Sequence, residues 1–175
     1  MIQDKWNKAL EFHGHACPGL AIGVRACNYL TQHRDFSSAS YGTLYCITEN
    51  DACGVDAIQC LLGCSVGKGN LLFKMTGKQA FSFFNKENGK GLRVYLKANK
   101  TEEMSREEWQ NSILNAPFED VFTLSEPTIP CPTPAQKFDT ILCEICGEGA
   151  AEPKIHLQKG KKVCSGCFEP YSRSL

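Results

Sequence analysis

The sequence predicts an α+β fold, with a mostly antiparallel sheet that has helices packed on it and a small C-terminal four-cysteine zinc-finger module. Three observations favour this class. Helical and β-rich patterns both occur in the first 116 residues. Five of the eight prolines lie within residues 117–138, which is typical of an extended connector. The last four cysteines form two C-x2-C pairs, and the hydrophobic (42%) and charged (22%) fractions are those of a soluble globular protein.

Four segments carry helix signals. The first has apolar residues at helical spacing and ends before Gly14, and Pro18 is a good first-turn residue for the next helix. Gly63 is a suitable C-terminal cap for the third segment. Ser105 and Glu108 match a capping box before the fourth. We expect helices over residues 2–12, 18–30, 49–63 and 105–115.

The β-rich segments predict a sheet. Residues 41–48, "YGTLYCIT", are typical of a strand. Residues 70–99 contain three β-rich runs separated by "TGK" and "NKENGKG", which indicates an antiparallel meander. We therefore predict an α+β core domain over residues 1–116, a proline-rich linker over 117–138 and a zinc-finger module over 139–175.

The C-terminal cysteines have the spacing of a zinc site. Cys143-x2-Cys146 is followed by seventeen residues and then Cys164-x2-Cys167. Four thiolates provide the closed tetrahedral coordination of structural zinc, and a module this small needs such a stabilising element. Two disulfides are the alternative. The beginning of the sequence lacks the apolar stretch of a secretory signal, so we expect a cytoplasmic location, where disulfides are rare.

Two further clusters each place a cysteine near a predicted helix start. In "FHGHACPGL", His13, His15 and Cys17 are spaced by two residues, and Cys17 precedes the helix that begins at Pro18. In "ENDACGVDAIQC", Cys53 lies near the start of the third helix, with Asp56 close by. Unpaired amides and the helix dipole favour a thiolate at such positions, which suits a nucleophile or a metal ligand. Small buried thiols beside structural histidines are the alternative interpretation.

Other polar features exclude some functions. Nineteen Lys and Arg balance nineteen Asp and Glu, so the chain lacks the strong positive field of a nucleic-acid-binding protein. No apolar run approaches the roughly 18 residues of a membrane span. "GCSVGKGN" lacks the spacing and context of a Walker phosphate loop, but Lys68 within it is a candidate contact to an anionic substrate. Cys27, Cys46 and Cys60 are interpreted as core packing.

Several long motifs carry a family resemblance. "FHGHACPGLAIGVRA", "ENDACGVDAIQCLLGCSVGKGNL" and "GKQAF", in this order, closely resemble the E-subunit family of formylmethanofuran dehydrogenase over about Leu10 to Ala98. Some members also carry a C-terminal treble-clef zinc finger. The resemblance implies an α+β core, a homodimer and a pocket that bears a metal or reactive thiols. Carried over residue by residue, it implies the pocket residues His15, Cys17, Cys53 and Cys64.

These residues lead to one favoured function and two alternatives. A mixed nitrogen and sulfur donor set suits Zn, Ni or Fe better than Mg or Ca, and a metal-free reactive thiol pair is the competing interpretation of the pocket. The favoured function is an accessory factor for a molybdenum or tungsten enzyme, with the subunits of that enzyme as partners. The alternatives are a cysteine- or metal-dependent enzyme acting on a small molecule and a zinc-finger regulator or protein-interaction module. For catalysis the candidates are Cys17, Cys53, Asp56 and Lys68, with Asp51 and Asp56 expected to orient His15 or act on bound water.

Overall fold

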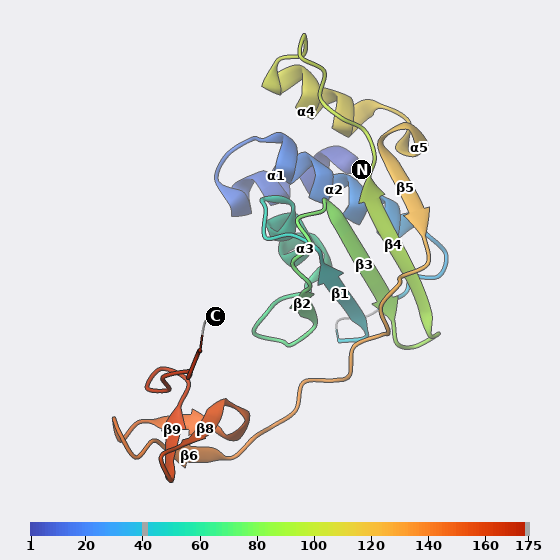
Figure 1. Cartoon of the computed structure of the whole chain (residues 1–175). Coiled ribbons are helices and arrows are strands. Elements are labelled where there is room, and N and C mark those ends of the chain that lie inside the picture. Colours follow the sequence, from blue (N-terminus) through green and yellow to red (C-terminus); the bar gives the residue numbers. More distant parts are fainter. Residues whose placement is uncertain (40–41, 174–175) are drawn as a thin grey trace. The chain divides into compact units, whose positions relative to one another are not determined.

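The chain divides into two units, Met1–Ala135 and Gln136–Leu175, in a computed structural model that describes residues 1–39 and 42–173. The first unit holds the helices and a five-stranded sheet, and the second holds two short hairpins. Figure 1 follows the chain through both.

The sheet of the first unit has the strand order β2-β1-β3-β4-β5. Neighbouring strands are antiparallel except β1 and β2, which pair in parallel from Cys46–Leu71 to Thr48–Phe73. The mostly antiparallel α+β prediction is therefore confirmed. The strands are β1 (Leu44–Thr48), β2 (Leu71–Phe73), β3 (Ala80–Asn85), β4 (Lys90–Leu96) and β5 (Phe122–Ser125).

The predicted meander is wrong at its first strand. Only β3 and β4 form an antiparallel hairpin among the three predicted runs, because β1 lies between β2 and β3. The chain leaves β1, passes through helix α3 (Gly54–Leu62) and returns in β2 beside β1. Such a crossover makes the two strands parallel. The beginning of the predicted 41–48 strand falls on residues outside the described part, and β1 starts at Leu44.

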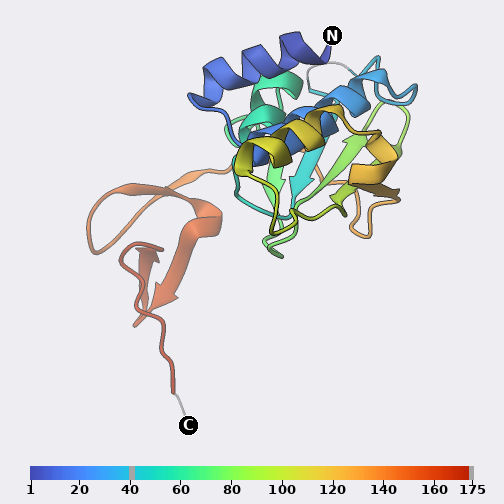
Figure 2. The ribbon, with the colours of Figure 1, turned by 90° about the horizontal axis from the view of Figure 1, so that it is seen from above.

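The helices lie against one face of the sheet, as Figure 2 shows from above. Pro18 begins α2, and Ser105 caps α4 through a capping box with Glu108, as the sequence predicts. Gly63 ends α3 in the left-handed conformation, with φ 68°. Besides α3, the helices of this unit are α1 (Ile2–His13), α2 (Pro18–Gln32), α4 (Arg106–Asn115) and the short α5 (Phe118–Val121).

Helix α3 begins five residues later than predicted. The side chain of Asn50 accepts a hydrogen bond from the amide of Ala52 at 3.1 Å, and Thr48 Oγ1 donates to the carbonyl of Asn50 at 2.7 Å. These local bonds replace the helical pattern, as short polar side chains commonly do. Residues 49–53 therefore form a loop that positions Cys53 directly before the helix.

The core lies between the sheet and the helices. Phe81 and Phe83 of β3 are fully buried there, together with Leu20 and Val24 of α2 and Ile58 of α3. The period-2 pattern of β3 places these two phenylalanines on the same face of the sheet. Burial of such side chains contributes about 1.5–3 kcal/mol each.

Helices α2 and α3 approach within backbone contact. A Cβ added to Gly23 would lie 2.2 Å from the carbonyl oxygen of Gly54, and a Cβ added to Gly54 would lie 3.0 Å from that of Gly19. The absence of side chains at these positions permits the contact. As a result, the N-terminal ends of α2 and α3 lie together.

The predicted linker begins later than residue 117. Helix α5 and strand β5 belong to the first unit, since β5 pairs with β4 from Phe122–Leu96 to Ser125–Arg93. Beyond β5, Pro127 packs on Gly91, and Ile129 packs on the outer apolar cluster of the sheet. The prolines flank this short edge strand without interrupting it, so composition alone did not reveal it.

The second unit consists of two antiparallel pairs. Strands β6 (Thr140–Leu142) and β7 (Gly149–Ala151) form one pair, and a short 3-10 helix η1 (Glu152–Lys154) leads to the second. Strands β8 (Ile155–Gln158) and β9 (Lys161–Cys164) form an antiparallel hairpin. Val163 of β9 is fully buried, but most of this unit is exposed. A core this small gives little stability by itself.

We predict that Gly23→Ala destabilises the protein by about 2 kcal/mol, because the added methyl group meets the Gly54 backbone, which cannot move alone. This loss outweighs the gain of about 1 kcal/mol in helix propensity. Urea unfolding measures it. Gly67→Ala is the control, since nothing lies within 4 Å of its added Cβ, and equal stability of the two variants would contradict the close-contact argument.

A buried ion pair predicts an acid-sensitive contribution to stability. Arg93 Nε donates to Glu49 Oε1 at 2.6 Å, and Thr76 Oγ1 donates to Glu49 Oε2 at 2.8 Å. The hydrogen bond from Arg93 lowers the pKa of Glu49 more than burial raises it. Because the pKa of Glu49 is lowered by folding, the ionised carboxylate stabilises the fold at every pH above its ordinary pKa of 4.5. This contribution to stability is lost as the pH falls through the lowered pKa of the folded state. The melting temperatures of wild type and Glu49→Gln should therefore differ by a constant amount near neutral pH and converge below pH 4.5; a difference that persists unchanged under acid conditions would refute this.

Candidate metal centre

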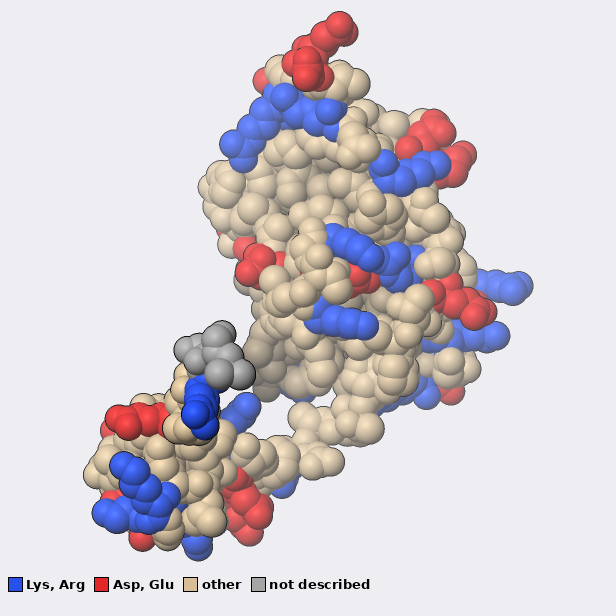
Figure 3. Space-filling view, viewed as in Figure 1, with Lys and Arg blue, Asp and Glu red and all other residues tan. Residues whose placement is uncertain are grey.

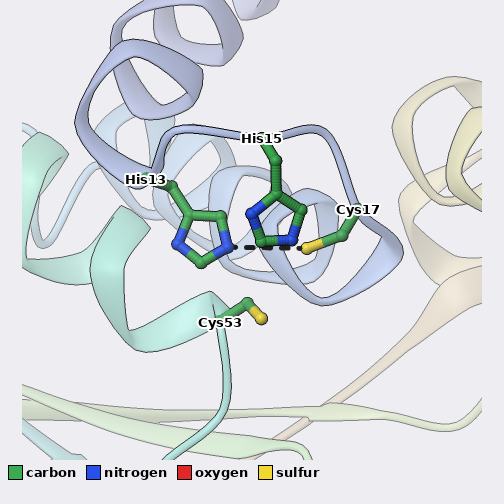
Figure 4. A group of neighbouring side chains, drawn as sticks. All are labelled: His13, His15, Cys17 and Cys53. Carbon is green, nitrogen blue, oxygen red and sulfur yellow. Dashed lines mark hydrogen bonds between the residues drawn. The ribbon is translucent and has the colours of Figure 1, made fainter.

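Four potential ligands from separate segments converge in the first unit. His13 ends α1, His15 lies in the following turn, Cys17 is the N-cap of α2 and Cys53 is the N-cap of α3. Their ligand atoms all lie within 4.8 Å of one another, and Figure 4 shows the four side chains directed toward a common point. We call this group the core cluster. The predicted convergence of two cysteine-bearing helix starts is thus present in the structure.

The turn between α1 and α2 brings both histidines into the core cluster. Gly14 adopts the left-handed conformation with φ 87°, and its amide bonds to the carbonyl of Leu10 to end α1. A glycine is favoured at such a helix end. The rings of His13 and His15 then lie with their centroids 4.4 Å apart.

Cys17 is held by the start of α2. It has an extended backbone, and its Sγ accepts a hydrogen bond from the amide of Leu20 at 3.3 Å. The side chain is only 2% exposed, and His13 Nε2 lies 3.8 Å from its sulfur. An amide donor at a helix N-terminus stabilises a negatively charged sulfur, so Cys17 has the environment expected of a thiolate ligand.

Cys53 differs from the sequence-based expectation. Its backbone is helical, and its side chain makes no capping hydrogen bond. Burial and the neighbouring Cys17 thiol raise the pKa of Cys53 above its ordinary value. Without a cation, Cys53 is therefore disfavoured as a thiolate nucleophile, whereas a bound metal ion would favour its deprotonated form.

His13 is a candidate ligand that the sequence analysis did not include. Its Nδ1 donates to Asp56 Oδ2 at 2.7 Å, and Gln59 Nε2 donates to Asp56 Oδ1 at 3.3 Å. Because a carboxylate only accepts hydrogen bonds, the Nδ1 proton leaves the lone pair of Nε2 facing Cys17. Asp56 therefore orients His13 and not His15, as expected for the outer partner of a metal-binding histidine. The four-residue spacing of His13 and Cys17 was the available signal.

Two predicted site residues lie elsewhere. Cys64 follows α3, whereas Cys53 precedes it, and a helix of nine residues is about 13 Å long. Cys64 is fully buried and donates to the carbonyl of Leu44 at 3.6 Å, and burial raises its pKa to about 12. Lys68 Nζ donates to the carbonyl of Gly63 at the same end of α3. The assignment of Cys64 to the pocket is therefore corrected, and Lys68, a candidate contact to an anionic substrate, does not join the core cluster.

Of the remaining cysteines in the first 64 residues, Cys27 and Cys46 pack in the hydrophobic core as predicted, whereas Cys60 lies outside it. Cys27 and Cys46 are fully buried, as predicted, and burial raises the pKa of both thiols well above the ordinary value. Cys60 is half-buried and donates to the carbonyl of Lys8. Asp51 is exposed on the loop before α3.

The second unit brings together the four predicted cysteines Cys143, Cys146, Cys164 and Cys167. Their sulfurs also lie within 4.8 Å of one another, a cluster that fits a zinc-finger module. Amides of Cys146, Cys164 and Ile145 lower the pKa of Cys143 to about 6. Hydrogen bonds with the neighbouring thiols Cys146 and Cys164, and to a smaller extent the repulsion from a negative Cys143 sulfur, raise the pKa of Cys167 to about 12. A divalent cation removes this repulsion, which makes the cluster a metal site.

Acidic and basic side chains are mixed on the face of the protein in Figure 3. Figure 3 shows Lys and Arg side chains in separate groups with Asp and Glu side chains among them, on the face that it draws. The formal net charge is +0. Within the described ranges, we find no helix with the length and apolar character needed to cross a membrane.

Comparisons with known proteins agree with this description. A curated relative, a probable S-adenosyl-L-methionine-binding protein of Archaeoglobus fulgidus, is 35% identical over 95 residues, which are 52% of this chain and 26% of the relative. The match thus spans about a quarter of that relative. A solved structure, a protein of Syntrophus aciditrophicus that is similar to the E subunit (FmdE) of tungsten formylmethanofuran dehydrogenase, has the same fold, with a TM-score of 0.72, 23% identity and coverage of 95% of this chain and 91% of the other. Residues 12–123, which include the core cluster, match the family described as FmdE, molybdenum formylmethanofuran dehydrogenase operon, and the chain belongs to this family.

Proposed function

We propose that the protein binds a transition metal ion at the core cluster and acts as an accessory factor for a molybdenum or tungsten enzyme. The observation that carries the metal site is the convergence of His13, His15, Cys17 and Cys53 within 4.8 Å, inside the family-matched region. Two sulfur and two nitrogen donors favour zinc, nickel or iron. The accessory role is inferred from the family description and the similar tungsten-enzyme-related protein.

The donor arrangement supports a metal site over a metal-free thiol pair. A reactive pair needs a readily formed thiolate, yet burial and Cys17 raise the pKa of Cys53. The Asp56–His13 hydrogen bond orients a nitrogen ligand toward the other three donors, as an outer partner of a metal-binding histidine does. Bound there, the ion would supply Lewis acidity, while the residues hold it and partly exclude water.

We further propose zinc for the cysteine cluster of the second unit. Four sulfurs form a closed site with no position for a substrate, which is the pattern of structural zinc. This unit would then contribute stability and a surface for protein contact. The near balance of acidic and basic residues favours a protein partner over nucleic acid.

A homodimer remains a proposal supported by the family resemblance. Helix α2 is mostly apolar, and an apolar helix face left uncovered in one chain would support a dimer. In the structure, however, α1, α3 and α4 pack on α2 within one chain. That face therefore gives no separate support for a dimer.

We predict that protein purified without chelator contains about two equivalents of metal per chain, one for each cluster. Cys17→Ser should lose the core equivalent alone. Serine is a good helix N-cap, so α2 should persist in this variant. Elemental analysis combined with circular dichroism measures both quantities. Wild-type metal content in Cys17→Ser, with intact helices, would disprove the core site.

We predict that Cys164→Ser loses the zinc of the second unit and unfolds that unit alone, because metal binding supplies much of the folding free energy of small zinc modules. Limited proteolysis should then cleave the chain after about Phe138, while residues 1–135 resist digestion. Cys131→Ser is the control, since Cys131 is exposed and lies outside both clusters. Full zinc content and full protease resistance in Cys164→Ser would exclude the assignment.

A further inference from the structure

The four side chains of the core cluster differ in their hydrogen bonds and in their burial. Cys17 accepts the amide of Leu20 and is 2% exposed. Cys53 precedes the first residue of α3, whose backbone contacts α2. The side chain of His13 is 10% exposed, and Asp56 fixes its ring. The side chains of Cys17 and His13 are therefore oriented before any ion binds, and the contact between α2 and α3 fixes the backbone position of Cys53.

His15 lacks a comparable anchor. It is exposed and lies in the turn between α1 and α2. Its ring contacts that of His13, but within residues 1–39 and 42–173 its side chain makes no hydrogen bond or ion pair. A side chain that is ordered only on binding pays its conformational entropy at that moment. His15 thus contributes less net binding free energy than His13.

A surface pocket adjoins the position of His15. Ala16, between His15 and Cys17, lines a pocket of about 290 Å³ together with Arg106, Glu107 and Gln110 of α4. This volume is close to the lower end of small-molecule sites, which begin at about 300 Å³. Ala16 thus places this pocket one residue along the chain from the unanchored ligand.

We propose that His15 is an exchangeable ligand of the core cluster and that a small molecule with a neutral nitrogen or oxygen donor takes its place. This inference rests on the proposed metal site. His13, Cys17 and Cys53 then form the permanent set of three, which is the number of protein ligands typical of catalytic sites with an open position. The protein would alternate between four protein ligands and three with an external one.

The charge of the site favours a neutral donor. Two cysteine thiolates balance a divalent cation, and both histidines bind as neutral imidazoles. An anionic ligand in place of His15 would leave a net negative charge beside Asp56, whose carboxylate already contacts His13. At the pocket, Arg106 and Glu107 offset one another. A neutral donor preserves the balance.

Cobalt substitution of the full chain tests the exchange, with imidazole as the external ligand. Cobalt reports its ligands by visible absorption, and Cys17→Ser supplies the spectrum of the second unit alone for subtraction. We expect imidazole to change the wild-type difference spectrum saturably, and to bind His15→Ala at least tenfold more tightly, because no side chain competes. In chelator competition, His13→Ala should lower core-site affinity at least about tenfold more than His15→Ala, as for a ligand fixed by an outer partner.

The possible results separate the inference from the function on which it rests. Equal cobalt content in wild type and Cys17→Ser would remove the proposed core site itself. A core site that is present in wild type but lost equally in His13→Ala and His15→Ala would overturn the exchange, as would a spectrum insensitive to imidazole in His15→Ala. Tighter binding of azide than of imidazole at constant pH would overturn the preference for a neutral donor.

Discussion

The backbone contact between α2 and α3 is the constraint on which the core cluster depends. Gly19, Gly23 and Gly54 lie at the crossing, and a Cβ added at Gly19 would lie 3.1 Å from Cβ of Cys53 and 3.9 Å from Sγ of Cys17. Side chains at this crossing would push the two helices apart, since protein interiors are closely packed. The glycines thus bring the cysteines at the two helix starts within range of one ion.

The sheet packs directly against this crossing of α2 and α3. Phe81 of β3 lies beside Gly54, with its ring 3.2 Å from the position of an added Cβ. The crossover from β1 through α3 to β2 fixes where α3 begins, because the loop at residues 49–53 follows directly after β1. Large apolar side chains on the sheet and glycines on the helices therefore position the cluster together. The chemistry lies at the edge of the core, and packing determines its geometry.

The two groups of potential metal ligands lie in different physical surroundings. In the second unit, four thiols lie in a segment with few buried residues, so an ion bound there would replace the missing hydrophobic core. In the first unit, the fold has a full core without any ion, and Asp56 and the amide of Leu20 orient the ligands. A metal ion in the cysteine cluster of the second unit would therefore serve stability, as we propose. The core cluster leaves one exposed histidine, which suits exchange with an external molecule.

The sequence by itself determined the local features of this protein. The helix boundaries at Pro18, Gly63 and Ser105 and the C-x2-C pairs depend on neighbouring residues, so short patterns predicted them. The family motifs also predicted that His15, Cys17 and Cys53 belong to one site.

Only the tertiary structure decided the long-range pairings. The position of β2 beside β1 and the addition of β5 to the sheet depend on partners far away in the chain, and composition carries no record of them. The dependence on long-range contacts also explains why the core cluster contains His13 and not the predicted Cys64. Cys53 and Cys64 flank α3, and the length of this helix separates Cys64 from the site. The turn at Gly14 and the carboxylate of Asp56 direct His13 into the site.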